Sequence, residues 1–268
     1  MLDAEQALVL KQIGVLAAFV GFALYERVAT AAPSPLLLSL QLGREQVRAW
    51  RRLGRNFGLF GINLVLSPLL VLPVTAWAEG FSTGLRPDWW TGWPGFALDL
   101  LLLDLWIYWW HRANHEIPFL WRFHEVHHLD ETLDTSTALR FHFGEVALSA
   151  GVRALVVILF DIPLASVVVF ETLVLVSAIF HHSDARLPPR LERWLAQGVI
   201  TPSIHWVHHH ARRTDTDSNY GTILSVWDRL FTTRSPTPRS PTMPIGVEGG
   251  ADQTFGALVL RPFRPARR

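Results

Sequence analysis

Residues 146–182 read VALSAGVRALVVILFDIPLASVVVFETLVLVSAIFHH, and this stretch decides the fold. Two long apolar runs are separated near Asp161-Ile-Pro163, where an acid that favours turns precedes a proline that cannot continue a helix. A helix that crosses a bilayer needs roughly 20 apolar residues, and each run comes close to that length. The stretch therefore predicts a hairpin of two membrane-spanning helices that ends in the pair His181-His182.

Three further apolar stretches precede the hairpin, at about residues 8–28, 57–78 and 96–110. The third is short and contains Asp99 and Asp104. Residues 35–42 are too few to span a bilayer, so we expect them at the membrane interface. Half of all residues are hydrophobic and 18% are charged, against about 25% charged in an average soluble domain. The sequence thus predicts an all-α, integral-membrane helical bundle of about four to five spans.

Arginines between the first two apolar stretches predict the orientation of the chain. They are Arg44, Arg48, Arg51, Arg52 and Arg55. Because Lys and Arg concentrate in cytoplasmic loops, this segment and the end of the hairpin should both lie in the cytoplasm. All 12 histidines lie between His111 and His210, in segments that the same topology places on that side. We therefore expect a cytosolic helical cap that carries the histidines.

The absence of cysteine limits the chemistry of the chain. It excludes disulfides, thiolate zinc sites and cysteine nucleophiles, so any bound metal must be held by His, Asp, Glu or the backbone. The formal net charge is only +1, and we accordingly expect no nucleic-acid partner.

Three histidine clusters recur along the chain. They are His111-Arg-Ala-Asn-His115, His124-Glu-Val-His-His128 and His205-Trp-Val-His-His209, the last followed by His210. On a helix, positions i, i+3 and i+4 share one face, with Cβ atoms about 5–6 Å apart, so histidines at these spacings can bind one ion. Adjacent histidines differ by about 100° around the helix axis and can address two ions. The clusters therefore predict a site for two metal ions.

The histidine clusters allow other interpretations, which would place the chain in other functional classes. A lone HxxxH is typical of structural histidines, and a histidine-rich tract can be a loose metal-buffering segment, but here the clusters are separate, short and repeated. A zinc protease needs Glu directly after the first histidine of its HExxH motif, and this chain has Arg112 there. Imidazole suits iron, copper, nickel and zinc alike, so the type of ligand does not select the metal.

Acidic residues near the histidines are candidates to orient them. Asp104 shares a helix face with His111, and an acid within a membrane span is usually functional, so it could accept the spare N–H of a metal-binding histidine. Alternatively, Asp104 pairs with an arginine or lines a polar gap between helices. We also expect Arg140 and Glu145 to form an ion pair that holds His142 in position.

Several motifs, in order over residues 104–233, resemble the fatty acid hydroxylase/sterol desaturase superfamily. Residues 104–115 resemble its first histidine box. Phe123-His-Glu-Val-His-His128, with the later Arg140-Phe-His142 and Glu145, resembles the second box. Phe180-His-His-Ser-Asp184 resembles a His-Ser-Asn element that follows the hairpin. The third box and its trailing signature are matched by Thr201-Pro202, residues 205–209, Asn219-Tyr-Gly221 and Trp227-Asp-Arg-Leu-Phe231.

The resemblance implies two iron ions held almost wholly by histidine, with zinc able to replace iron in purified protein. It assigns metal ligation to His111, His115, His124, His127, His128, His182, His205, His208 and His209. Further candidates, as ligands or as partners of ligands, are His142, His181, Asp104 and Asp184. His181 and His182 compete for one position. No catalytic residue beyond the metal ligands and no site for another cofactor are implied.

The activity implied by the resemblance is a membrane-bound non-haem di-iron oxidoreductase that uses O2 to hydroxylate or desaturate a lipid or sterol-like substrate. Electrons should come from a separate reductase, because the sequence contains no visible haem-binding or flavin-binding domain. Two alternatives stay open: a membrane metal-binding protein without turnover, and an ether-lipid-cleaving monooxygenase on the same scaffold. Phe143, Asp184 and Thr232 stand where the family commonly has Pro, Asn and Gly, departures that concern the substrate more than metal binding.

The expected organisation has three parts. Residues 1–94 hold the N-terminal spans and the basic loop, and residues 95–233 form the histidine-box catalytic domain with the hairpin. Residues 234–268 are rich in Pro, Arg and Gly and form a C-terminal tail along the surface, with no assignable chemistry.

Overall fold

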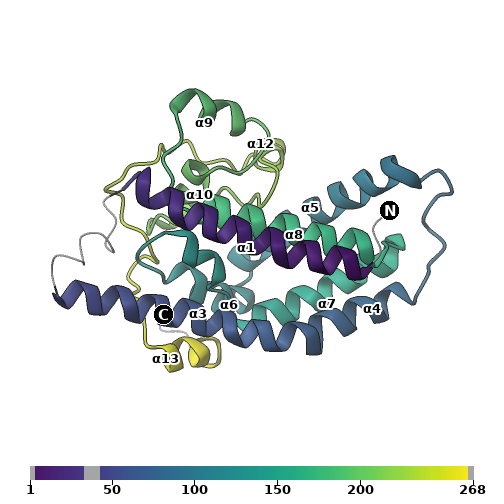
Figure 1. Ribbon diagram of the computed structural model, residues 1–268, viewed down its shortest axis with the longest axis horizontal. Coiled ribbons are helices and arrows are strands. Elements are labelled where there is room, and N and C mark those ends of the chain that lie inside the picture. Colours follow the sequence, from purple (N-terminus) through teal and green to yellow (C-terminus); the bar gives the residue numbers. More distant parts are fainter. Residues whose placement is uncertain (1–3, 33–42, 265–268) are drawn as a thin grey trace.

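The computed structural model describes residues 4–32 and 43–264, and helices dominate this part of the chain (Figure 1). The long helices are α1 (Ala4–Val28), α3 (Gly43–Leu66), α5 (Gly92–Glu116), α7 (Phe143–Phe160) and α8 (Leu164–His182). Within the described residues no strand forms, only isolated bridges such as the one between Val199 and Leu224. The all-α prediction is confirmed. The segment 35–42, expected at the membrane interface, lies outside the described residues.

Shorter helices gather toward one end of the long ones (Figure 1). They are α6 (Pro118–His128), η2 (Thr135–Leu139), α9 (Pro189–Leu195), α10 (Pro202–His208), α11 (Arg213–Thr216), α12 (Val226–Leu230), α13 (Phe255–Leu260) and η3 (Arg261–Phe263). This end of the molecule forms a cap, while the loop over residues 80–91 lies at the opposite end (Figure 1).

The predicted hairpin is confirmed as α7 and α8, both long and apolar enough to cross a membrane. Asp161 ends α7 in the left-handed conformation, with φ of 49°, and Pro163 precedes the first residue of α8. The Asp161 Oδ1 accepts a hydrogen bond of 2.9 Å from the Thr83 backbone N–H, so the turn is tied to the loop that precedes α5. Ile162 is fully buried between these elements and joins the apolar core of the bundle.

The second predicted span is also confirmed, as one continuous helical segment, Val47–Glu79. It comprises α3, a π-helical turn η1 (Ser67–Val71) and α4 (Leu72–Glu79). Pro68 in the π-helical turn lacks a backbone N–H, and such widened turns form where the regular ladder of a helix is interrupted. Only 6% of the most apolar part of the segment is buried inside the protein, so its apolar side chains face outward, as expected for a helix in contact with lipid.

The first and third predicted spans correspond to α1 and α5. Helix α1 packs along α8, where the Lys11 ammonium pairs with Glu171 and the rings of Phe22 and Phe180 lie 5.3 Å apart. Helix α5 carries the buried Asp99, which accepts hydrogen bonds from Arg86 and from the Ser166 hydroxyl. Three described segments, Val47–Glu79, α7 and α8, are long and apolar enough to span, so a total of four to five spans stays a prediction.

The described part of the C-terminal tail is tied to the cap by specific contacts. The Asp252 carboxylate pairs with Arg140 at 2.5 Å, and Arg239 pairs with Asp184 at 2.8 Å. Helix α13 lies against α3, where Leu258 is fully buried with Leu59. The described part of the tail is therefore attached to the cap and to α3 by buried side chains and ion pairs.

Candidate metal centre

Four helices bring their histidines to one place between the long helices and the cap. Helix α5 ends at Glu116 and α6 begins at Pro118, because the residue before a proline avoids the helical conformation; Ile117 is extended, with φ of −94° and ψ of 113°. The chain reverses there, so the first two histidine clusters face each other. The third cluster lies on α10 and its C-terminal cap residue His209, and the end of α8 supplies His182.

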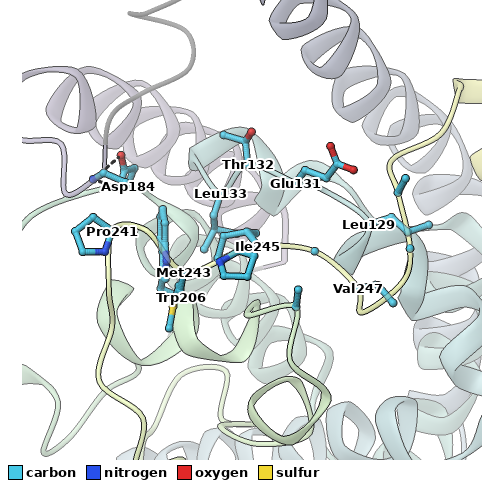
Figure 2. Close-up of a pocket in the computed structure, with 16 residues that line it drawn as sticks. Leu129, Glu131, Thr132, Leu133, Asp184, Trp206, Pro241, Met243, Ile245 and Val247 are labelled. Atoms are coloured by element: carbon cyan, nitrogen blue, oxygen red, sulfur yellow. Dashed lines mark hydrogen bonds between the residues drawn. The ribbon is translucent and has the colours of Figure 1, made fainter.

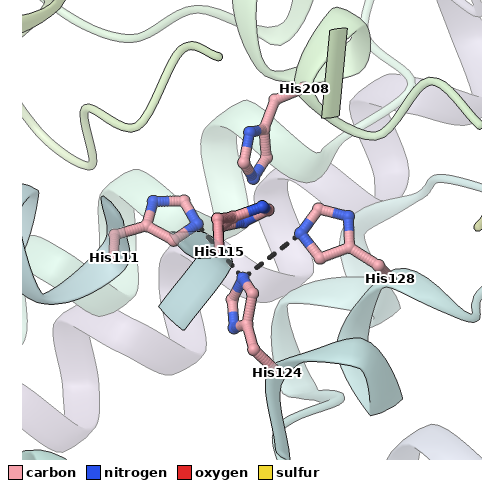
Figure 3. A group of neighbouring side chains, drawn as sticks. All are labelled: His111, His115, His124, His128 and His208. Atoms are coloured by element: carbon pink, nitrogen blue, oxygen red, sulfur yellow. Dashed lines mark hydrogen bonds between the residues drawn. The ribbon is translucent and has the colours of Figure 1, made fainter. Parts of the chain in front are cut away.

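Five side chains form the first set, which we call group one: His111, His115, His124, His128 and His208. Their candidate ligand nitrogens all lie within 4.8 Å of one another. Figure 3 shows the five rings converging on a common centre. The Nε2 atom of His124 lies 3.2 Å from the Nε2 atom of His111 and 3.2 Å from that of His128. Helices α5, α6 and α10 all contribute to group one.

Four side chains form the second set, group two: His127, His182, His205 and His209. All four are buried, and their candidate ligand nitrogens again lie within 4.8 Å of one another. The Nε2 atom of His182 lies 3.0 Å from that of His127 and 2.9 Å from that of His205. The two groups adjoin, because the rings of His128 and His209 stack with centroids 4.4 Å apart.

Each HxxHH motif is divided between the two groups, and the division is reciprocal. In α6, His124 and His128 at positions i and i+4 belong to group one, while His127 at i+3 belongs to group two. In α10 the i and i+4 pair, His205 and His209, belongs to group two, while His208 belongs to group one. Neighbouring positions differ by about 100° around a helix, so one short helix reaches both groups.

Backbone and carboxylate oxygens orient six of the nine imidazoles through Nδ1. The His111 Nδ1 donates to the Tyr220 carbonyl at 2.8 Å, and the His127 Nδ1 donates to the Arg140 carbonyl at 3.2 Å. Likewise, the His182 Nδ1 donates to the Ala178 carbonyl at 2.7 Å, and the His208 Nδ1 to the Ser218 carbonyl at 2.6 Å. Glu145 accepts from His124 at 2.8 Å, and Asp217 lies 3.3 Å from the Nδ1 atom of His115. A carbonyl or carboxylate can only accept, so Nδ1 carries the proton and the lone pair is left on Nε2.

The nitrogen lone pairs now face each other, and this arrangement fits bound cations. His111 and His124 both carry the proton on Nδ1, yet their Nε2 atoms are 3.2 Å apart and cannot hydrogen bond to each other. The same holds for His127 and His182 at 3.0 Å. Two nitrogens bound at about 2.1 Å to one ion lie about 3.0–3.4 Å apart at angles of about 90–110°. The histidine nitrogens are therefore arranged as ligands for two metal ions.

Burial keeps these imidazoles neutral. It lowers the pKa of His208 to about 3, and it holds the pKa values of His128 and His209 well below the ordinary value, with the neighbouring histidines adding to the effect. Burial likewise lowers the pKa values of His127 and His205. A neutral imidazole is the form that binds a metal, so the electrostatics of the pocket and the geometry of the nitrogens agree.

The other four candidate residues lie outside both groups. His142 directly precedes α7, where its Nδ1 accepts from the Gly144 N–H. The His181 ring is tilted by 41° against that of His205, with centroids 3.9 Å apart. Asp184 accepts from the backbone N–H of Ala32 and pairs with Arg239. Of the two interpretations of Asp104, the structure does not support the one in which it accepts from a histidine, since it accepts from the Trp227 indole N–H at 2.8 Å and from the Leu224 N–H.

The expected ion pair between Arg140 and Glu145 is wrong. Glu145 binds His124, while Arg140 binds Asp252, which lies more than a hundred residues further along the chain. The backbone acceptors at Ser218 and Tyr220 were missed altogether, because every residue has a carbonyl and no side chain marks these two. Asp217 had a signal of its own, an acid shortly before the Asn219-Tyr-Gly221 motif.

A cavity of about 460 Å³ lies beside the histidine groups rather than at them. Leu129, Trp206, Met243 and Ile245 give it apolar walls, with Asp184 at one side (Figure 2). Its described lining residues include none of the nine histidines, although Leu129 and Trp206 directly follow His128 and His205 in the sequence.

Comparisons with known proteins agree on one family. A family model described as "Fatty acid hydroxylase" matches residues 96–233. An ornithine lipid hydroxylase of Rhizobium tropici is 28% identical over 198 residues, or 73% of this chain and 58% of the relative. An alkylglycerol monooxygenase of Danio rerio is 35% identical over 55% of this chain and 31% of the relative. The cholesterol 25-hydroxylase of Rattus norvegicus is 25% identical over 57% of this chain and 51% of the relative.

These matches span between 31% and 58% of the length of the three relatives. No solved structure gives a significant match. The matched region contains all nine histidines of the two groups and both helices of the hairpin. With more than half of its residues matched by the family model, the chain belongs to the fatty acid hydroxylase family.

Proposed function

We propose that the protein is a membrane-bound, non-haem di-iron oxidoreductase that uses O2 to hydroxylate or desaturate a lipid or sterol-like substrate. One observation carries this proposal: nine imidazoles form two adjoining groups whose unprotonated nitrogens face one another at the end of apolar helices. The names of the relatives, an ornithine lipid hydroxylase and a cholesterol 25-hydroxylase among them, support a lipid as the substrate.

In this proposal each of the nine histidines provides one nitrogen, five to one iron ion and four to the other. Bound iron would supply the O2-dependent oxidation of an unactivated C–H bond. The chain itself orients the rings through Nδ1, with Glu145 and the carbonyls of Tyr220 and Ala178 among the acceptors. It also keeps water out, since eight of the nine side chains are buried. Oriented ligands tune the metal, and exclusion of water limits side reactions at an oxidising site.

We place the site on the cytoplasmic face of the membrane. The arginine-rich start of α3 supports this placement, because Lys and Arg concentrate on that side. Arg52 of that segment donates to Asp130 at 2.5 Å, and Asp130 follows His128 by two residues. The basic segment and the histidines therefore lie at the same end of the bundle (Figure 1). The substrate would enter from the bilayer between the apolar helices.

A second candidate is cleavage of an ether lipid by the same site. It is favoured by the alkylglycerol monooxygenases, which reach 35% identity to this chain in Danio rerio and 33% in Homo sapiens. Both reactions need the same two metal ions and a separate electron donor, and they differ in the substrate carbon that reacts.

The test is metal analysis of the full chain purified without oxygen, followed by a reaction under 18O2 with a lipid extract and dithionite as the electron source. We expect two iron ions per chain and, for hydroxylation, 18O in a lipid product. Desaturation would instead remove two hydrogens without adding 18O, and ether cleavage would release an aldehyde. A chain that carries only zinc in cells and consumes no O2 would be a metal-binding protein, which contradicts the proposal.

A further inference from the structure

The His127 imidazole of group two is contacted by Arg140 and Phe141, and Arg140 also binds the residue that precedes it. The Arg140 carbonyl accepts from the His127 Nδ1 at 3.2 Å, and the Arg140 Nε donates to the carbonyl of Val126 at 2.8 Å. The ring of Phe141 stacks on the His127 ring, with centroids 4.4 Å apart and an angle of 11° between the planes. The Arg140 carbonyl and the Phe141 ring therefore orient this imidazole, while the Arg140 guanidinium fixes the backbone beside it.

Arg140 in turn depends on the C-terminal tail. Its side chain is fully buried, and a buried guanidinium needs a carboxylate partner to offset the loss of water. Asp252 provides it, with contacts of 2.5 Å to Nη2 and 3.3 Å to Nη1, and the same carboxylate also pairs with Arg55. Asn56 accepts from Nη1 at 3.1 Å, while Asp130 is 3.9 Å away and already bound by Arg52. Asp252 is thus the main charged partner of Arg140.

Group one is linked to the tail by a different route: Glu248 accepts from the Arg213 backbone N–H at 3.2 Å, and Arg213 donates to Asp217 and to the His115 carbonyl. Its orienting acceptors Glu145, Asp217 and the carbonyl of Tyr220 all lie within residues 96–233. Asp252 lies beyond the region that the family model matches. A disturbance at Asp252 would reach His127, and with it group two, before it reached group one.

We propose that Asp252 is a positioning residue of the metal site at group two: through the buried guanidinium of Arg140 it fixes the imidazole of His127. This inference rests on the proposed function, because it takes the two groups to bind metal. The C-terminal tail is then part of the site, because it supplies the carboxylate that pairs with Arg140, and Arg140 and Phe141 orient His127.

The test compares Asp252→Asn with the unchanged chain and with Glu248→Gln. Glu248 is a second carboxylate of the tail, and it binds the backbone N–H of Arg213 rather than Arg140. Each full-length protein is loaded with iron, and the ions are removed by titration with a chelator. For Asp252→Asn we expect one of the two ions to be held roughly 10- to 100-fold more weakly, as is usual when a partner of a ligand is removed. Glu248→Gln keeps an oxygen that accepts from the Arg213 N–H, so it should hold both ions as the unchanged chain does.

A second variant distinguishes a local effect on the metal site from misfolding. Asp252→Glu keeps the buried charges paired but lengthens the side chain by one methylene, so it should fold and weaken the same single ion to a smaller extent. If Asp252→Asn held both ions as tightly as the unchanged chain does, the inference would be overturned. Equal weakening of both ions in Asp252→Glu, with loss of helicity, would also overturn it, because the residue would then act on the fold as a whole. An unchanged chain that binds no pair of ions would instead contradict the proposed function.

Discussion

At the scale of single residues, the site depends on the angle between neighbouring side chains of a helix. His127 and His128 are adjacent, yet they belong to different groups. His208 and His209 are separated in the same way. Because each group takes histidines from both HxxHH motifs, the loss of one imidazole should disturb one ion first and its neighbour second.

Replacing His128 or His209 by alanine tests this arrangement. We expect His128→Ala to weaken the ion of group one and His209→Ala that of group two, each abolishing activity while the protein still inserts in the membrane. His210→Ala is the matched control, because the His210 Nδ1 pairs with Asp215 outside both groups. Iron content and activity of the purified variants are the measurements. Full activity in either of the first two variants would contradict their assignment as ligands.

Glu145 gives a second prediction at this scale. Its carboxylate is the charged acceptor for the His124 Nδ1 at 2.8 Å, and removing the charge makes His124 a weaker donor to a cation. Glu145→Gln should lower the affinity for the group-one ion roughly tenfold or more. Glu116→Gln is the control, since Glu116 is exposed and pairs with Arg112 on the surface of α5. Chelator titration of both proteins decides the point, and equal affinities would exclude this role.

At the scale of elements, the hairpin depends on one residue with positive φ. Asp161 adopts φ of 49°, where a β-branched side chain clashes with the backbone at a cost of roughly 1–2 kcal/mol. Asp161→Val should therefore lower the thermal midpoint of the protein in detergent. Asp161→Asn keeps both the tolerance for this conformation and an oxygen for the Thr83 N–H, so it should stay close to the unchanged chain. A valine variant as stable as the asparagine variant would show that the turn can relax.

A close approach between α6 and α7 is the second feature at this scale. A Cβ atom on Gly144 would lie 2.5 Å from the Phe123 ring, directly between the segments that carry His124 and Glu145. Gly144→Ala should therefore separate α6 from α7, destabilise the protein by about 1–3 kcal/mol and weaken metal binding. Gly151→Ala is the control on the same helix, because a Cβ atom there meets nothing within 4 Å. Thermal midpoints and iron content of the two variants would separate crowding from a general effect of alanine.

At the scale of the whole molecule, the orientation in the membrane can be tested with cysteines, because the chain has none of its own. Ser82 lies in the exposed loop at one end, and Thr214 is exposed in the cap at the other. In intact cells a membrane-impermeant maleimide should label Ser82→Cys, and it should label Thr214→Cys only after permeabilisation. The opposite pattern would place the histidines on the outer face. Labelling of both residues without permeabilisation would mean that the membrane does not separate the two ends of the protein.

The architecture followed from local patterns in the chain. The apolar runs on either side of Asp161 required a hairpin of helices, and the i, i+3 and i+4 spacings required the histidines of each cluster to share a helix face. Both features depend only on the rise and turn of a helix, which are the same in every protein. They could therefore be predicted before any contact between helices was known.

Contacts between distant segments were decided only by the tertiary structure. The division of nine histidines into five and four depends on the rotation of α6, α10 and α8 against one another, which local spacing leaves free. The partners of Asp104 and Arg140 proved to be Trp227 and Asp252, on segments far along the chain. Helical periodicity is a property of neighbouring residues, whereas the choice of a hydrogen-bond acceptor depends on which carbonyl or carboxylate the packing of the whole chain brings near.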